Sequence, residues 1–270
     1  MLKMEFILKN FIKSILFSCV CCTGLRANEY QSRKLFFNEK FGQQKQLWVV
    51  GYINSNINHY LNDIEASFSN GANAIVFESS DYKKLDEALS EIRKKYPHHI
   101  FGVNFLGPDD HLMTYKETFE LAKKHKLQIA WTDFSGVDLI KESPEVSLHE
   151  IDKLKPKDVF YVSGIHMKYS TLIDPEKTIE RSAIQAMGWV DGIVITGQKT
   201  GVATDQLKAK KARSVIGDFP MGAASGVSAE NIKDIKKYID FVLVNTSISD
   251  KNHRIIGEKV KALRLALDKK

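Results

Sequence analysis

Short apolar runs that end in small polar residues recur along the chain from residue 33 onwards, and a helical pattern follows each run. Apolar runs without alternation are typical of parallel strands that helices cover on both faces. The first five predicted strands span residues 47–53, 72–77, 100–105, 128–131 and 158–163, and the last three lie within 189–201, 219–232 and 239–248.

This pattern makes eight strand–helix units, spaced by roughly 25 to 30 residues, which favours a closed (β/α)8 TIM barrel with α/β architecture. Residues 33–46 are predicted to form a lead-in helix across the barrel floor. An open doubly wound sheet shares the alternation. However, no GxGxxG motif follows the first strand, which removes the strongest reason to prefer that sheet.

The stretch from Gly188 to Ser247 carries the most specific signal. Loops after strands seven and eight, with a helix N-terminus, form the usual phosphate site of such a barrel. Ser228 is predicted to cap a helix whose free N–H groups would face an anion, and Gly226 would let the anion approach closely. The predicted phosphate-binding residues are Ser225, Gly226, Val227, Thr246 and Ser247.

Further polar residues stand at or just after the ends of the other predicted strands, where a barrel of this kind carries its chemistry. Glu78, Asp133 and Lys168 are the catalytic candidates. Asn104, Thr196 and Gly197 are the ligand-binding candidates.

Two carboxylates, one lysine and an amide around a mouth can serve several chemistries. The carboxylates can exchange protons with a sugar or polyol carbon, and Lys168 can hold a second anionic group, stabilise an enolate or form a Schiff base. No metal site is predicted and no cofactor is required, although a divalent metal between Glu78 and Asp133 is compatible with the sequence. His166 and the pair His98 and His99 are interpreted as surface or loop residues.

The 270 residues, with 43% hydrophobic and 27% charged, suit one globular barrel domain over 33–270. The net charge of +6 and the pI near 9.0 come from lysines spread over helix faces, for example Lys208, Lys210 and Lys211, which are interpreted as solvated. No cluster of arginine and aromatic residues points to nucleic acid. The predicted partner is a small phosphorylated ligand, and a homo-oligomer remains open.

The first 27 residues form a separate, signal-like or extra N-terminal segment. They contain all three cysteines, and lysines precede an uncharged run over residues 14–25 that is too short for a confident membrane span. If this segment is a signal, the protein is exported or membrane-associated, and otherwise it is cytoplasmic. The barrel itself contains no cysteine, which excludes a disulfide framework or a cysteine metal site there.

Over residues 33–249 the chain resembles the BtpA family, named for a photosystem I biogenesis protein and similar to ribulose-phosphate-binding barrels. The resemblance rests on motifs at the predicted strand ends, namely 101–104, 132–136, 191–197 with 200–201, 225–227 with 230–231, and 246–247. It implies a phosphate at Gly226, Val227, Thr246 and Ser247, and a functional Lys168.

The chain also departs from the family pattern. Asn54 replaces a histidine after the first strand, Tyr169 replaces a histidine after Lys168, Ala224 replaces a glycine, and Ser249 replaces a lysine.

Two interpretations follow. The first is an enzyme, a lyase or isomerase acting on a small phosphorylated metabolite. The second is a non-catalytic biogenesis or assembly factor that keeps a ligand site. The predicted phosphate-binding residues (the phosphate clamp) and the carboxylates favour the enzyme. The histidine and the lysine that are replaced at Asn54 and Ser249 favour the non-catalytic factor. The fold cannot decide between them, because barrels host many chemistries.

Overall fold

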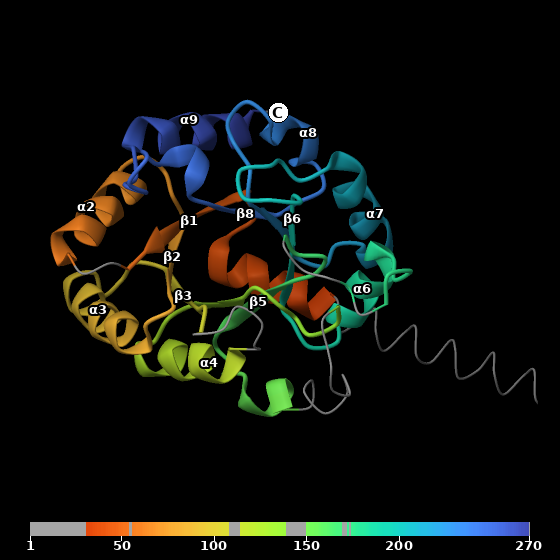
Figure 1. The fold of residues 1–270 in the computed structure, drawn as a ribbon, viewed down its shortest axis with the longest axis horizontal. Coiled ribbons are helices and arrows are strands. Elements are labelled where there is room, and N and C mark those ends of the chain that lie inside the picture. The colour runs from red at the N-terminus through yellow and green to blue at the C-terminus, as the bar shows by residue number, and fades with distance from the viewer. Residues whose placement is uncertain are drawn as a thin grey trace, which may run out of the picture.

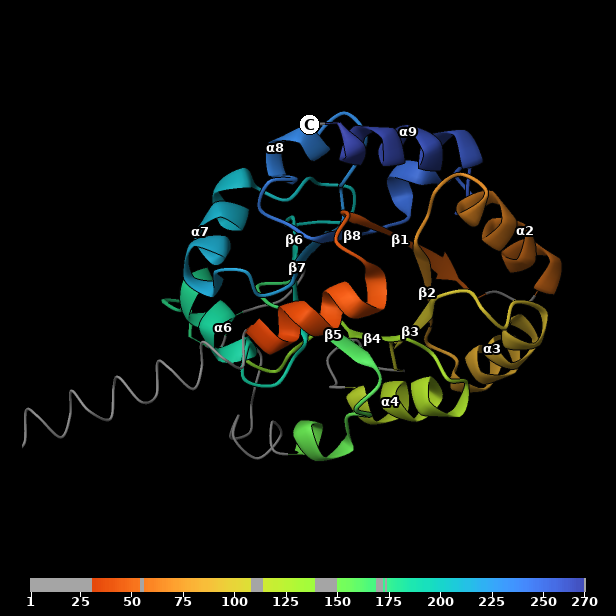
Figure 2. The ribbon, with the colours of Figure 1, turned by 180° about the vertical axis from the view of Figure 1, so that it is seen from behind.

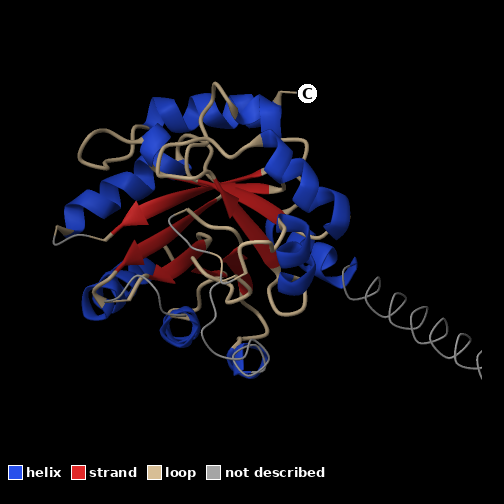
Figure 3. Cartoon of the chain, turned by 45° about the vertical axis from the view of Figure 1, so that its right-hand side comes forward, coloured by secondary structure: helices blue, strands red, loops and turns tan. Residues whose placement is uncertain are grey.

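The fold is a closed barrel of eight parallel strands in the order β1 to β8, surrounded by helices (Figures 1 and 3). The computed structural model describes residues 31–53, 56–107, 114–138, 150–168, 172 and 174–269. The segment 1–27, Asn54 and Tyr169 lie outside the described residues, and so do residues 108–110, where the sequence Pro-Asp-Asp predicts the start of a helix. The predicted TIM barrel is confirmed.

The strands are β1 Gln46–Tyr52, β2 Ala74–Ser79, β3 Phe101–Phe105, β4 Ile129–Thr132, β5 Phe160–Gly164, β6 Gly192–Thr196, β7 Met221–Ala224 and β8 Phe241–Val244. The helices are α2 Ile57–Phe68, α3 Tyr82–Lys95, α4 Tyr115–Lys124, α6 Ile179–Ala186, α7 Gln206–Ile216, α8 Ile232–Ile235 and α9 Gly257–Asp268. Residues 31–41 and 150–154 are also helical, and residues 246–248 form a 3₁₀ turn.

The predicted lead-in helix does cross the amino end of the barrel (Figure 2), but it spans residues 31–41 and not 33–46, because Gln46 already belongs to β1. Its Phe37 and Phe41 are buried against Trp48 and Phe160, with ring centroids 5.1 to 6.4 Å apart. Trp48 also stacks on Phe241 at 4.3 Å. Aromatic rings therefore fill the barrel floor, which leaves the opposite, carboxyl end as the open end.

One device recurs at the start of every even-numbered strand. The residue just before each of these strands is an Asn, Gln or Asp, and it makes two hydrogen bonds to one residue near the start of the preceding strand. Its backbone N–H donates to the carbonyl of that partner. Its side-chain oxygen accepts from the backbone N–H of the same partner. The pairs are Asn73 with Leu47, Gln128 with Phe101, Asp191 with Tyr161 and Asp240 with Met221, all at 2.7 to 3.0 Å. These contacts hold the strands in register, which fixes the side chains at their other ends.

The two carboxylates of this set, Asp191 and Asp240, also bind the helix at 31–41. Asp191 is fully buried and binds Arg33 together with Lys155, and Asp240 binds Lys34. The floor is thus closed by aromatic packing and by charge-assisted hydrogen bonds.

The sequence pattern predicts helix starts at Asp174, with Pro175 in the first turn, at Ser228 and at about Lys251, and the structure places all three later. Helix α6 begins at Ile179 with Thr178 as its N-cap, because Asp174 closes a separate turn on the N–H of Glu176. Helix α8 begins at Ile232, not after Ser228. Helix α9, expected from residue 251, begins at Gly257, because residues 249–256 fold back in a loop bridged between residues 249 and 255.

Candidate functional site

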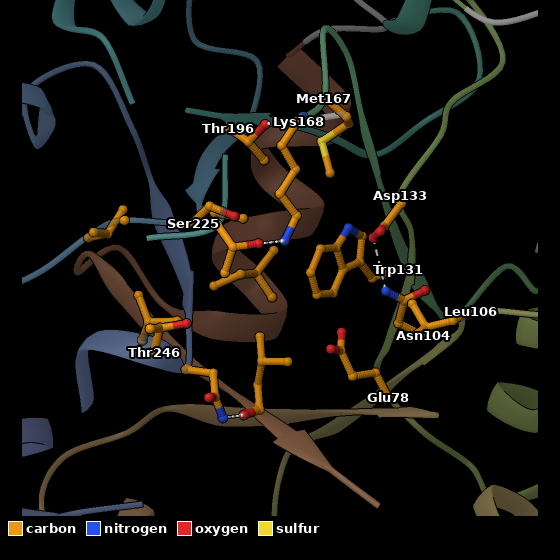
Figure 4. Close-up of a pocket in the computed structure, with 18 of the residues that line it drawn as sticks. Glu78, Asn104, Leu106, Trp131, Asp133, Met167, Lys168, Thr196, Ser225 and Thr246 are labelled. Atoms are coloured by element: carbon orange, nitrogen blue, oxygen red, sulfur yellow. Dashed lines mark hydrogen bonds between the residues drawn. The ribbon is translucent and has the colours of Figure 1, made fainter. Parts of the chain in front are cut away.

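A cavity of about 350 Å³ opens among the carboxyl ends of the strands (Figure 4). Every residue proposed from the sequence lines it, with the sole exception of Gly197. The predicted catalytic side chains come from the β2, β4 and β5 side of the mouth, and the predicted phosphate residues come from the loops after β7 and β8. The sequence therefore predicted which residues meet at the mouth.

Four side chains, three from β1, β2 and β3 and one from the residue after β4, form one hydrogen-bonded chain along one wall. Tyr52, Glu78 and Asn104 stand in register across β1, β2 and β3. Glu78 accepts hydrogen bonds from the Tyr52 hydroxyl and from the Asn104 amide. Asn104 Nδ2 also donates to Asp133 Oδ1 at 3.1 Å. The two carboxylates are thus connected through a single amide.

The two carboxylates of this chain have different environments. Glu78 is only 8% exposed, and its burial, followed by the nearby charge of Asp133, raises its pKa to about 8. The cation of Lys168 and the two hydrogen bonds oppose this shift in part. Asp133 is half-buried. Two carboxyl groups that differ in this way can divide the roles of proton donor and proton acceptor.

Lys168 reaches the cavity from the loop after β5. Its backbone N–H donates to Thr196 Oγ1 at 2.7 Å, and its ammonium donates to Thr200 Oγ1 at 3.2 Å. Figure 4 shows its side chain extending into the cavity, between the phosphate loops and Trp131. The hydroxyl of Thr196 is therefore engaged in positioning Lys168, in addition to lining the cavity.

The glycines of the loops after β6 and β7 have a different role from the predicted one. A Cβ on Gly226 would lie 2.1 Å from the backbone of Val202, and a Cβ on Gly197 would lie 2.1 Å from the Val202 carbonyl oxygen. Both glycines are thus required where these loops pack together. The expectation that a side chain at Gly226 would occupy the phosphate position is wrong, because the backbone of another loop fills that direction.

The predicted helix cap at Ser228 is also wrong. The N–H of Ser228 donates to Asn231 Oδ1, and Asn231 Nδ2 donates to the carbonyl of Gly226. This side chain closes a turn over residues 228–231, so the helix starts four residues later and has a single turn. Its amino end contributes nothing comparable to the dipole of a full helix.

Backbone amides supply the anion donors instead. The N–H groups of Gly226, Val227, Thr246 and Ser247 donate to no other residue in the described part of the chain. All four residues line the cavity. Convergent free N–H groups in loops are typical anion-binding elements. Ser225 precedes them with φ +62°, an unusual conformation for a residue with a side chain.

Three residues of the site region were not found from the sequence. Tyr52 and Trp131 both line the cavity but were taken as strand core. The sequence did contain a clue for Tyr52. Side chains alternate between the two faces of a strand, so Tyr52 lies on the same face as Val50, which also lines the cavity. Lys208, interpreted as solvated, is half-buried, and its ammonium donates to the carbonyls of His166 and Thr196 at 2.6 and 2.8 Å.

This burial lowers the pKa of Lys208 to about 8. The loop after β5 is further held by His166, whose N–H donates to Asp138 at 2.5 Å and whose ring contacts Ser182 at 3.1 Å. Gly197 and Lys208 line a second, adjoining cavity of about 560 Å³ that shares Thr196 and Met167 with the first. Lys208 therefore supports the wall between the two cavities.

Within the described residues, no three His, Cys, Asp or Glu side chains are grouped as metal ligands. None of the described helices has both the length and the apolar character needed to cross a lipid bilayer.

Comparison with known proteins finds a family match in the second half of the chain. The chain is a TIM barrel whose residues 135–267 match the BtpA family. It is 28% identical over 128 residues to the uncharacterized protein MJ1115 of Methanocaldococcus jannaschii and 25% identical over 122 residues to the uncharacterized protein PF0860 of Pyrococcus furiosus. These matches span 44% and 43% of this chain and less than half of each relative, 44% and 45%.

Solved structures share the fold of this chain at low sequence identity. Phosphoribosyl anthranilate isomerase of Thermus thermophilus is 15% identical, with a TM-score of 0.55 over 82% of this chain and 98% of that one. Tryptophan synthase of Mycobacterium tuberculosis is 12% identical, with a TM-score of 0.60 over 90% and 98%. KGPDC of Streptococcus mutans is 13% identical, with a TM-score of 0.57 over 83% and 98%. These likenesses concern the fold alone.

Proposed function

We propose that this barrel binds a small phosphorylated metabolite in the mouth and catalyses proton transfer on it, as a lyase or isomerase. The observation that carries the proposal is the hydrogen-bonded chain from Tyr52 through Glu78 and Asn104 to Asp133, in the same cavity as the free amides of the loops after β7 and β8. The phosphate would bind to Ser225, Gly226, Val227, Thr246 and Ser247.

In this mechanism Asp133 removes a proton from a carbon next to a carbonyl, and Glu78, protonated at neutral pH, donates one to the developing oxygen. Lys168 stabilises the negative charge of the enolate. A carboxyl group with a pKa of about 8 beside a second carboxylate suits this division of roles. A structural neighbour with the same fold is an isomerase of phosphoribosyl anthranilate, which agrees with the class of ligand.

The binding half of the proposal is tested by thermal unfolding with inorganic phosphate or sulfate. A ligand present at about 100 times its Kd stabilises the folded state by roughly 2.7 kcal/mol. The double variant Thr246→Val/Ser247→Ala removes two hydroxyls and should be protected less, whereas Ser214→Ala on the exposed face of α7 should be protected like the wild type. Equal protection of all three proteins would place the anion elsewhere.

The catalytic half is tested by solvent exchange. Incubation with a panel of sugar phosphates in D₂O should incorporate deuterium next to the carbonyl of the true ligand, measured by mass spectrometry. Glu78→Gln and Asp133→Asn should each slow this exchange by about 100-fold or more, the usual contribution of a general acid or base. A phosphorylated ligand that binds without any exchange would refute the enzyme.

That last outcome would support the alternative, a non-catalytic biogenesis-type factor with a retained ligand site. One observation favours it. Ser249, which follows the phosphate loop, is buried with its hydroxyl bonded to Asn245 Oδ1 at 3.2 Å, so this position contributes no cation to the clamp.

A further inference from the structure

The second cavity, of about 560 Å³, adjoins the mouth and has no part in the function proposed above. Four of the residues that line it carry titratable or amide side chains, namely His166, Gln198, Asp205 and Lys208. His166 and Lys208 are half-buried, whereas Gln198 and Asp205 are exposed. One side of this cavity is therefore built from partly buried titratable groups, and the other side is open to solvent.

A hydrogen-bonded relay behind the cavity fixes the proton on the ring of His166. Ser182 Oγ donates to Asp138 Oδ1 at 2.5 Å, and it lies 3.1 Å from His166 Nε2. A hydroxyl has one hydrogen, which Ser182 gives to the carboxylate, so Ser182 can only accept from Nε2. Nε2 therefore carries the hydrogen, and in the neutral ring the lone pair is on Nδ1.

Nδ1 is the end of this relay that a ligand can reach. It makes no hydrogen bond within the described part of the chain, and His166 lines the second cavity. Ser182 and Asp138, at the other end, are 0% and 6% exposed. The backbone of His166 has φ +44°, which a residue with a side chain seldom adopts. Asp138 and Lys208 hold it there by accepting its N–H and donating to its carbonyl.

The charge state of His166 suits a proton acceptor. Burial lowers the pKa of His166, and the cations of Lys208 and Lys177 act in the same direction. The carboxylates of Asp138 and Glu180 oppose this shift in part. The ring is therefore neutral at physiological pH. A proton taken up on Nδ1 would be stabilised by Asp138 through Ser182, as a carboxylate stabilises the imidazolium of a catalytic triad.

The other polar groups of the cavity determine the charge of its ligand. Asp205 and Lys208 lie one turn apart at the start of α7, so opposite charges stand on one face. Asp205 Oδ1 caps the N–H of Leu207, which leaves Oδ2. Lys208 uses two of its three N–H groups on backbone carbonyls, which leaves one. A simple cation or anion would meet a like charge here, whereas a zwitterion matches both groups.

We propose that the second cavity binds a free amino acid, with its ammonium between His166 Nδ1 and the Asp205 carboxylate and its carboxylate on the remaining N–H of Lys208. The apolar residues Leu172 and Val202 of the cavity would contact its side chain. His166 is the proton acceptor of this site. Transfer of one proton from the ammonium to Nδ1 gives an imidazolium and a neutral amine, which is the nucleophilic form. The site uses none of the residues of the phosphate clamp, so it stands whether or not the mouth binds a phosphate ester.

Binding is tested by calorimetric titration of the full chain with the common amino acids, one at a time. At least one of them should bind. Its N-acetyl derivative lacks the ammonium and its methyl ester lacks the carboxylate. Each derivative should bind about tenfold or more weakly, because each loses a charge-assisted hydrogen bond.

Two variants localise the site. Asp205→Asn keeps a residue that caps helices and removes the charge, and His166→Gln removes the ring. Each should weaken binding of the amino acid by about tenfold or more and leave the binding of inorganic phosphate unchanged. Asp218→Asn, at an exposed turn after α7, is the matched control and should bind like the wild type. If His166→Gln does not fold, Asp205→Asn decides the case.

Nuclear magnetic resonance tests the relay itself, because the ring nitrogens of labelled histidine report their own protonation. The signals of His166 are those that His166→Gln lacks. They should show a neutral ring at neutral pH with the hydrogen on Nε2, and the bound amino acid should shift the Nδ1 signal. Ser182→Ala should remove the preference for this tautomer.

Each outcome decides the claim. An amino acid that binds the wild type and Asp218→Asn but not Asp205→Asn supports the site. Failure of every amino acid to bind, or equal affinity in Asp205→Asn and the wild type, overturns it. A ring of His166 that is charged at neutral pH, or that carries its hydrogen on Nδ1, would refute the role of His166 as proton acceptor.

Discussion

Tyr52 and Glu78 stand in register across β1 and β2, and the phenol donates a hydrogen bond to the carboxyl group. The contact joins a residue that sequence alone assigned to the core with one that it assigned to catalysis. Burial and the neighbouring Glu78 also raise the pKa of Tyr52, so the phenol stays protonated and remains a donor over the physiological range. Glu78 is thereby held toward the cavity in a protonated state at neutral pH.

The raised pKa of Glu78 has a consequence for stability. Its pKa is about 8 in the folded protein against 4.5 ordinarily, so the folded state binds the proton more tightly than the unfolded state does. Stability should therefore fall as pH rises from about 4.5 to about 8, by about 1.4 kcal/mol for each unit of pKa difference. Glu78→Gln keeps a neutral side chain and should remove this loss.

The measurement is chemical denaturation of both proteins at pH 5 and pH 8.5. The stability of the glutamine variant relative to the wild type should rise between the two values. Glu91→Gln, at an exposed position of α3, controls for the loss of a carboxylate. A difference between Glu78→Gln and the wild type that is independent of pH would show that Glu78 titrates normally.

Lys168 is expected to serve the ligand and not the fold. Its ammonium makes one bond, to the Thr200 hydroxyl at a partly exposed position, so Lys168→Met should change the free energy of unfolding by no more than about 0.5 kcal/mol. The affinity for a phosphorylated ligand should fall markedly. Lys210→Met, on the exposed face of α7, is the charge-matched control and should leave affinity unchanged. A destabilised Lys168→Met protein with normal affinity would assign the lysine to structure.

Lys208 is expected to show the opposite behaviour. Its ammonium caps the carbonyls of His166 and Thr196, at the two strand ends that flank Lys168. Lys208→Met would leave both acceptors unpaired, which should cost about 1 to 3 kcal/mol of stability. Denaturant unfolding of this variant beside Lys211→Met, an exposed neighbour, measures the difference. Equal stability of the two variants would mean that water replaces the ammonium at no cost.

Lys168 was predicted from the sequence to lie at the site, whereas the structural contacts of Lys208 were not predicted, and the reason shows how far sequence reasoning reaches. Parallel strands in a closed barrel bring their carboxyl ends together, so Glu78, Asn104 and Asp133 could be assigned to one mouth from the strand pattern. Lys208 could not be separated from Lys210 and Lys211, because only the contact with the β5 and β6 loops distinguishes it.

The wrong predictions for Gly226 and for the start of α8 also come from contacts between loops that the sequence pattern does not show. The role of Gly226 depends on the backbone of Val202, which a distant loop brings against it. The late start of α8 depends on one side chain, Asn231, which turns back to Gly226 and Ser228. Residue types predict which strand ends carry polar groups, whereas loop-to-loop packing decides which of those groups stay free for a ligand.

The barrel floor allows stability to be separated from function. Asp191 is fully buried, accepts the N–H of Tyr161 and binds the cations of Lys155 and Arg33, at the end of the barrel opposite the cavity. Asp191→Ala would leave the partly buried cations of Arg33 and Lys155 and the N–H of Tyr161 without their partner, which should destabilise the fold by about 3 kcal/mol. Asp218→Ala, at an exposed turn, should have little effect. At a temperature where Asp191→Ala is still folded, its affinity for inorganic phosphate should equal that of the wild type. A large loss of affinity with unchanged unfolding would mean that the floor contact communicates with the mouth instead of holding the helix at 31–41.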